Sequence, residues 1–229
     1  MSQVADNLLF VRERIEKAAL KAGRDPSEIK LVAVSKTVGI EKVKEAVSAG
    51  VTILGENYVQ EARKKIEAIG HQVQWHMIGH LQTNKVKQAV GLFDVLESVD
   101  RISLAKEIDK RGKQLGRNVS VLIQVNISGE ATKSGIEREK TISLISEISN
   151  LTNIRVEGLM TMPPYFADPQ IARPYFQLLR ALKEEIERAR FENVSMRELS
   201  MGMSHDFEAA IEEGATIVRI GTAIFGERG

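Results

Sequence analysis

Hydrophobic and polar positions follow two alternating patterns along most of the chain. Short, nearly continuous apolar runs rich in β-branched residues are separated by charged segments in which apolar residues recur every three or four positions. The apolar runs predict strands at 29–35, 52–54, 73–78, 93–98, 119–127, 154–161, 197–201 and 216–220. The periodic segments predict helices at 41–49, 59–69, 84–90, 102–115, 136–149, 172–190 and 206–213.

A further amphipathic helix is predicted at the N-terminus, where Val4, Leu8, Val11 and Ile15 follow a three-to-four spacing. Strands that are apolar throughout and alternate with helices are typical of a parallel sheet covered by helices. Eight such units predict an α/β protein with a single (β/α)₈ TIM barrel and an extra N-terminal helix, forming one domain over residues 1–229. A doubly wound open sheet shows the same alternation and is the alternative.

Composition narrows the range of partners. The 229 residues are 43% hydrophobic, and 32 Lys and Arg against 31 Asp and Glu leave a net charge of +1, without the basic excess of a typical nucleic-acid-binding protein. The absence of cysteine excludes disulfides, thiolate metal sites and a cysteine nucleophile. The N-terminus lacks a signal-peptide pattern, and no apolar run approaches the ~20 residues of a membrane span. We therefore expect a cytoplasmic protein with neither a membrane nor a nucleic acid as partner.

In a TIM barrel, functional residues lie at the carboxyl ends of the strands and in the loops that follow them. Lys36 comes directly after the first apolar strand. Apolar walls around it would lower the pKa of its amine and favour Schiff-base formation. A lysine at a strand end also commonly extends along apolar surface to water, and its position alone leaves that structural interpretation open.

The loops after the last two strands predict a phosphate site. The segments 199–204 and 219–223 combine glycines, which allow a ligand to approach the backbone, with hydroxyls and N–H groups at helix starts, which favour an anion. TIM barrels often bind phosphate between these two loops, although glycine in a short loop is also ordinary turn chemistry. Because the first and last strands of a closed barrel are neighbours, Lys36 and the phosphate site would share one pocket.

A lysine beside a phosphate site fits two chemistries. One is an aldolase-type Schiff base with a sugar phosphate, and the other is lysine-bound pyridoxal phosphate. Arg219, near the end of its strand, could face a pyridine nitrogen and keep it unprotonated, because a guanidinium does not give up its own proton. That contact would weaken the ring as an electron sink, and the residues alone leave both chemistries open.

Other polar residues favour structural interpretations. His76 and His80 would stand ~13 Å apart in a strand that rises ~3.3 Å per residue, too far to bind one metal ion, so we expect no metal site. Ser134 followed by Glu137 predicts a capping box at a helix start. Asn57 lies where either turn chemistry or a ligand contact is expected.

Eight segments together carry a resemblance to a known family. They are VAVSKT at 32–37, GENYVQE at 55–61, WHMIG at 75–79, LQTNK at 81–85, KSG at 133–135, GLM at 158–160, SMGMS at 200–204 and VRIGTAIFG at 218–226. In this order, across essentially the whole chain, they resemble the pyridoxal-phosphate homeostasis protein family (YggS/PROSC), and GENYVQE and VRIGTAIFG are the most specific. The chain departs from the family pattern at His80, where proline usually follows the glycine.

The resemblance implies a barrel similar to the N-terminal domain of alanine racemase, with pyridoxal 5′-phosphate, a form of vitamin B6, as cofactor. It implies that Lys36 forms the Schiff base and that Arg219 faces the pyridine nitrogen. Five residues would hold the phosphate: Ser200, Met203, Ser204, Gly221 and Thr222. Asn57 and Met77 would line the pocket.

The family is known mainly for maintaining the supply of pyridoxal phosphate, so the resemblance implies a cofactor carrier with little or no catalysis and with cofactor-dependent apoenzymes as candidate recipients. The alternative is a pyridoxal-phosphate-dependent amino-acid racemase. Racemisation needs a base on each face of the substrate, and in alanine racemase the second is a tyrosine from a separate domain of a partner subunit. The sequence ends at Gly229, and we expect no such domain. Tyr58, Tyr165 and Tyr175 lie in predicted loops or helix starts and do not suggest a replacement.

Overall fold

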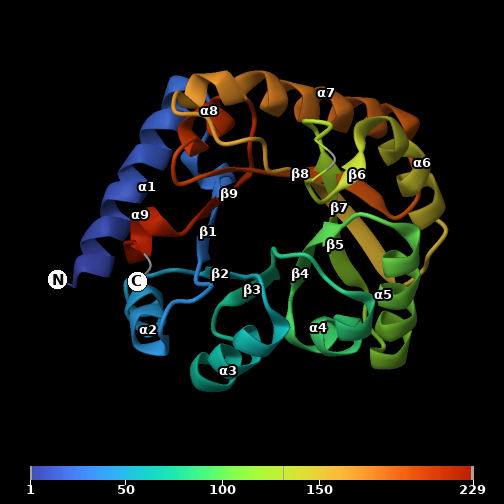
Figure 1. Cartoon of the computed structure of the whole chain (residues 1–229), viewed down its shortest axis with the longest axis horizontal. Coiled ribbons are helices and arrows are strands. Elements are labelled where there is room, and N and C mark those ends of the chain that lie inside the picture. The colour runs from blue at the N-terminus through green and yellow to red at the C-terminus, as the bar shows by residue number, and fades with distance from the viewer. Residues whose placement is uncertain (1, 131, 228–229) are drawn as a thin grey trace.

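The computed structural model describes residues 2–130 and 132–227, which form a ring of helices around a barrel of strands (Figure 1). The strands of the barrel are β1 (Lys30–Val34), β2 (Ile53–Glu56), β3 (Gln74–Met77), β4 (Val95–Val99), β5 (Val119–Asn126), β7 (Ile154–Met160), β8 (Val194–Met203) and β9 (Ile217–Ile220). A two-residue strand, β6 (Ile136–Glu137), pairs with the end of β5 outside the barrel order.

The helices are α1 (Gln3–Lys21), α2 (Ile40–Ser48), α3 (Val59–Ile69), α4 (Val86–Leu92), α5 (Ile102–Leu115), α6 (Arg138–Ile148), α7 (Arg173–Ala189), α8 (Phe207–Glu212) and α9 (Thr222–Phe225). Short 3₁₀ turns lie at Pro26–Glu28, Thr83–Lys85 and Pro169–Ala172. Within the described part of the chain, no helix is long and apolar enough to cross a membrane.

The strands close into a complete barrel. Each pairs in parallel with the next, in the order β1–β2–β3–β4–β5–β7–β8–β9, and β9 pairs back with β1. The predicted (β/α)₈ barrel is confirmed, and the open doubly wound sheet is excluded because the β4–β5 and β9–β1 pairings leave no edge in the barrel. The β1–β9 register places Ala33 opposite Ile220, so the loops after these two strands are neighbours, as expected.

The apolar core has two layers. A large cluster lies between the strands and the surrounding helices, which explains why the strands are apolar nearly throughout. A small cluster lies inside the barrel and consists of side chains from five strands: Val32, Ile53, Leu122, Met160 and Ile217. The core inside the barrel therefore closes it to water and leaves the functional residues at the carboxyl end of the strands.

The predicted N-terminal helix is α1, which the Ser2 side chain caps by accepting a hydrogen bond from the backbone N–H of Ala5. It packs against α8 and α9, and it is joined to them by an ion pair between Arg14 and Glu208 and a bond from the Asn7 amide to the Ile224 carbonyl. Since α9 has only four residues, α1 covers the side of the barrel that the last helix leaves open.

The predicted capping box is wrong. Helix α6 begins at Arg138, and Glu137 is its N-cap residue, without a side-chain capping bond. The backbone at Ile136 and Glu137 pairs with β5 and so does not form the predicted first turn. Ser134 lies before this strand, and its carbonyl accepts a bond from the Gln124 amide at 3.3 Å.

Candidate functional site

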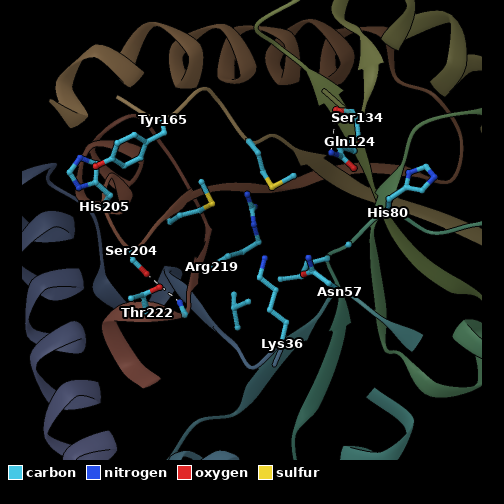
Figure 2. A pocket seen from close by; sticks show the side chains of 16 residues that line it. Lys36, Asn57, His80, Gln124, Ser134, Tyr165, Ser204, His205, Arg219 and Thr222 are labelled. Atoms are coloured by element: carbon cyan, nitrogen blue, oxygen red, sulfur yellow. Dashed lines mark hydrogen bonds between the residues drawn. The ribbon is translucent and has the colours of Figure 1, made fainter. Parts of the chain in front are cut away.

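A pocket of about 350 Å³ opens at the carboxyl end of the barrel, and Figure 2 shows its lining. Seven of the nine residues predicted for the site contribute to this lining: Lys36, Asn57, Met203, Ser204, Arg219, Gly221 and Thr222. Lys36 and Arg219 lie at the centre of the view, with Ser204 and Thr222 to one side and His80 and Gln124 to the other (Figure 2). The closed barrel therefore brings the first and last strands together at one site.

Lys36 follows β1 and is half-buried, and its side chain extends into the pocket (Figure 2). Its two neighbours differ sharply in environment. Ser35 is fully buried, whereas Thr37 is exposed and has a φ of 62°, in the left-handed region. The reactive candidate thus lies at the point where the chain leaves the buried strand through a strained turn.

Arg219 is buried against the pocket and held by two bonds. Its guanidinium donates to the Ser200 hydroxyl at 2.5 Å and to the Thr161 carbonyl at 2.8 Å. Burial lowers the pKa of Arg219, and the nearby carboxylates of Glu97 and Asp206 oppose this effect without cancelling it. The arginine is fixed as a rigid donor rather than a mobile surface charge.

Glu97 is the buried carboxylate beneath this arginine. It is fully buried, accepts from the Ser200 hydroxyl at 2.5 Å, lies 2.6 Å from His76 Nδ1 and is 3.9 Å from the Arg219 guanidinium. Burial alone would raise the pKa of Glu97, but the bonds and charges of these three residues outweigh it and hold the pKa below its usual value. Glu97 is therefore the negative charge that balances Arg219 inside the barrel.

The predicted phosphate loops meet at Ser204. Its hydroxyl oxygen lies 3.3 Å from the backbone nitrogen of Gly221 and 3.4 Å from that of Ala223, and both N–H groups donate to it. Gly202, with a φ of 91°, lets β8 end close against α8, because a Cβ there would lie 2.6 Å from the Ala210 Cβ. Two backbone donors and a hydroxyl thus meet at one end of the pocket, where an anion would replace the Ser204 oxygen as the acceptor of these N–H groups.

Two predicted site residues lie outside the lining. Met77 is 1% exposed and packs in the core between strands and helices. Ser200 is fully buried, and its hydroxyl is already bonded to both Glu97 and Arg219. The structure places Ser200 as the link between these two charges rather than among the groups that line the pocket.

Sequence reasoning missed several lining residues. Tyr165 and His205 both line the pocket, with ring centroids 5.0 Å apart, and His205 Nε2 lies 3.0 Å from the Phe166 carbonyl, to which it donates. No periodic signal marks them, because they come from loops. Glu97 did leave a signal, as a charged residue within the apolar strand β4.

The two histidines considered earlier have separate environments. His76 is buried against Glu97, while His80 lines the pocket with half of its side chain exposed. Among the described residues, no group of three or more His, Asp or Glu side chains could hold a metal ion.

Comparison with known proteins identifies the family. Residues 7–229 match the family described as alanine racemase, N-terminal domain. The chain is 50% identical over 224 residues to the pyridoxal phosphate homeostasis protein of Aquifex aeolicus, covering 97% of both chains. This chain is therefore a member of the alanine racemase N-terminal-domain family and, within it, of the pyridoxal phosphate homeostasis proteins.

Solved structures agree with the fold. PipY of Synechococcus elongatus, whose structure has pyridoxal phosphate bound, is 31% identical with a TM-score of 0.85, and the match covers 97% of this chain and 100% of PipY. The alanine racemase of Clostridium difficile is similar in fold, with a TM-score of 0.73 at 19% identity, and the match covers 97% of this chain but 57% of the racemase.

Proposed function

We propose that this protein binds pyridoxal 5′-phosphate as a Schiff base on Lys36 and holds it for supply within the cell, with little or no catalysis of its own. The observation that carries the proposal is the presence of an amine, a loop hydroxyl with two backbone N–H groups and a buried guanidinium in one pocket, contributed by Lys36, Ser204 and Arg219. The names of the relatives and the cofactor bound to PipY support it.

The residues of the pocket fit this cofactor. In the proposal, the hydroxyls of Ser204 and Thr222 would donate to the phosphate, and the N–H groups of Gly221 and Ala223 would turn to it from the Ser204 oxygen that accepts them in the structure. The guanidinium of Arg219 would face the ring nitrogen, and Asn57, which also lines the pocket, would contact the bound group. The bound group supplies an aldehyde, with which the Lys36 amine condenses with loss of water.

Arg219 supports a carrier rather than a strong catalyst. Its guanidinium is fixed by Ser200 and Thr161 and keeps its proton, so a nitrogen facing it accepts a hydrogen bond without becoming protonated. An unprotonated pyridine ring withdraws electrons weakly. Cofactor-dependent apoenzymes are the recipients that a carrier of this kind would serve.

The test is chemical labelling of the purified protein. After incubation with pyridoxal 5′-phosphate, borohydride reduction and peptide mapping, the label is expected on Lys36, and Lys36→Ala should lose both the label and the visible absorption band. Lys44→Ala is the control, because Lys44 is exposed on α2 and ion-paired with Glu41 outside the pocket. A colourless protein, or equal labelling of the Lys36→Ala variant, would refute the proposal.

A second candidate function is amino-acid racemisation. The observation that favours it is that Tyr165 and His205, two groups capable of proton transfer, line the same pocket as Lys36. Turnover of D- and L-amino acids well above the free-cofactor background, abolished by Lys36→Ala and by Tyr165→Phe, would favour the racemase. The carrier proposal predicts no such turnover.

A further inference from the structure

A buried charge cluster lies directly behind Lys36. Its members are Ser35, Glu56 and Lys65, which are 0%, 0% and 3% exposed, together with the half-buried Glu61. The ammonium of Lys65 reaches inward from α3 and donates to Glu56 and to Glu61, each at 2.7 Å. The Ser35 hydroxyl donates to the same oxygen of Glu56 at 2.6 Å. The cluster thus connects α3 to the ends of β1 and β2.

This cluster holds the two peptide units that flank the Cα atom of Lys36. On one side, the carbonyl of Ser35 accepts a bond from the Lys65 ammonium at 2.5 Å. On the other side, the backbone N–H of Thr37 donates to Glu61 at 2.6 Å. Because Lys65 also binds Glu61, the two bonds share one rigid support. The direction in which the Lys36 side chain leaves the backbone is therefore set from both sides.

The backbone next to Lys36 needs such support. The Ser35 carbonyl also accepts from the N–H of Val38 at 3.0 Å, which closes a tight turn with Lys36 and Thr37 at its centre. Thr37 is β-branched and has a φ of 62°, a conformation that costs of the order of 1–2 kcal/mol for a residue other than glycine. Strain of this kind persists where surrounding contacts over-determine the backbone, as the Glu61 bond to Thr37 does.

Stability alone does not account for this cluster. Burying an ammonium and a carboxylate costs free energy that their mutual attraction offsets only in part, and well-packed apolar residues often serve a core equally well. The two glutamates belong to the GENYVQE segment at 55–61, in which Asn57 contributes to the pocket lining and neither Glu56 nor Glu61 does. The contacts of the glutamates are instead made to the turn that carries Lys36.

We infer that Lys65, Glu56 and Glu61 are positioning residues that fix the backbone of Lys36, so that its amine meets the aldehyde of a bound cofactor in the orientation needed for Schiff-base formation. In that reaction a C=N bond forms between the amine and the aldehyde carbon, and water leaves. The inference rests on the proposed function, because it concerns the covalent bond of Lys36. It adds that the bond depends on residues that do not line the pocket.

Two probes separate the covalent bond from binding to the pocket. Pyridoxal 5′-phosphate reports both, whereas its 4-deoxy analogue lacks the aldehyde and reports the pocket alone. At equal cofactor occupancy, Lys65→Met and Glu61→Leu should each lower the fraction of Lys36 that borohydride traps by about tenfold or more. The reason is that an amine pointing in the wrong direction loses the rate advantage of correct orientation. Affinity for the analogue should stay within about twofold of wild type.

Conservative and matched variants complete the test. Glu61→Gln keeps an oxygen that can accept from Thr37 and should keep most of the trapping, whereas Glu61→Leu should not. Arg63→Met removes a cation from the exposed part of the same helix and should leave both probes unchanged.

The outcomes distinguish this inference from the proposed function. Unchanged trapping in Lys65→Met and Glu61→Leu would overturn the inference, as would an equal loss of both probes, which would mean that the variants damage the whole pocket. If Lys65→Met does not fold, the comparison of Glu61→Leu with Glu61→Gln decides the test, because Glu61 is only half-buried and its substitution threatens the fold less. Absence of trapping on Lys36 in the wild-type protein would instead refute the proposed function itself.

Discussion

The charge pair formed by Glu97 and Arg219 allows a quantitative test of what holds the pocket together. The two side chains are 0% and 3% exposed, and their charges are 3.9 Å apart with the Ser200 hydroxyl bonded to both. Replacing Glu97 by Leu leaves the buried guanidinium with the Ser200 and Thr161 oxygens but without its main balancing charge. Removing one partner of a buried pair typically costs about 3–5 kcal/mol, whereas replacing both by apolar residues is often neutral.

We therefore expect Glu97→Leu and Arg219→Met to lower the free energy of unfolding by about 3 kcal/mol each, the lower end of this range, because each remaining partner keeps other contacts. In Glu97→Leu the arginine keeps its bond to Thr161 and the Asp206 charge, and in Arg219→Met the glutamate keeps Ser200 and His76. The loss of unfolding free energy in the double variant should be smaller than the sum of the two single losses by about 2 kcal/mol or more. The assay is urea unfolding of the cofactor-free protein. Wild type and variants must have equal m-values, so that a shift of the midpoint reports a change in stability. The same cycle on the exposed pair of Arg63 and Glu67 should show a coupling of about 0.5 kcal/mol or less. Equal coupling in the two cycles would refute the reasoning.

Three further predictions concern pH, the strand contacts and the anion site. The pKa of Glu97 is lower in the folded protein than in the unfolded chain. The ionised carboxylate therefore adds to the free energy of unfolding above the unfolded pKa of ~4.3, and this stabilisation is lost as the pH falls through the folded pKa. The difference in free energy of unfolding between wild type and Glu97→Gln should narrow below about pH 4. Gly158→Ala should destabilise the fold by about 2 kcal/mol or more, because its Cβ would lie 1.9 Å from the Glu198 carbonyl oxygen. Gly91→Ala, in open space on a helix, should be neutral or stabilising in the same thermal or urea unfolding assay, and equal effects at the two glycines would contradict this contact. Ser204→Ala should lower the affinity for pyridoxal phosphate about tenfold in a fluorescence titration, and an unchanged affinity would mean that this hydroxyl does not hold the phosphate.

Much of the site could be read from the sequence because barrel topology is regular. If the eight strand–helix units form a closed barrel, Lys36 and the loop at Gly221 lie side by side, because the first and last strands of the barrel are then neighbours, as the β1–β9 pairing shows. Glycines and hydroxyls in short loops carry local signals, so position alone indicates the loops at 199–204 and 219–223 as a candidate phosphate site. The resemblance to the family singled out Ser204 and Thr222 within them, and both line the pocket.

Predictions that depended on one local pattern were less secure. The spacing of Ser134 and Glu137 predicts a helix cap, but the backbone between them pairs with β5, and a sheet contact of this kind leaves no trace in the local sequence. Ser200 has the hydroxyl expected of a phosphate ligand, yet that hydroxyl is bonded to Glu97, which lies 103 positions away. No local pattern reports which buried partner a polar side chain will meet.

The sequence by itself determined the alternating strand–helix units, the covering N-terminal helix and the strand ends at which the candidate amine and the candidate phosphate loops lie, because hydrophobic periodicity and turn residues are local properties. It left closed and open sheets as alternatives, and the strand pairings of the structure decided for the closed barrel. Only the tertiary structure decided how those groups are supported. Glu97 balances Arg219 from the opposite side of the barrel interior, and Lys65 reaches from α3 to the turn that carries Lys36. The first contact arises because closure of the barrel brings inward-facing polar groups of distant strands together, and the second because α3 packs against the ends of β1 and β2 and buries Lys65 there. In both places water is excluded, so each polar group must find a partner in the protein.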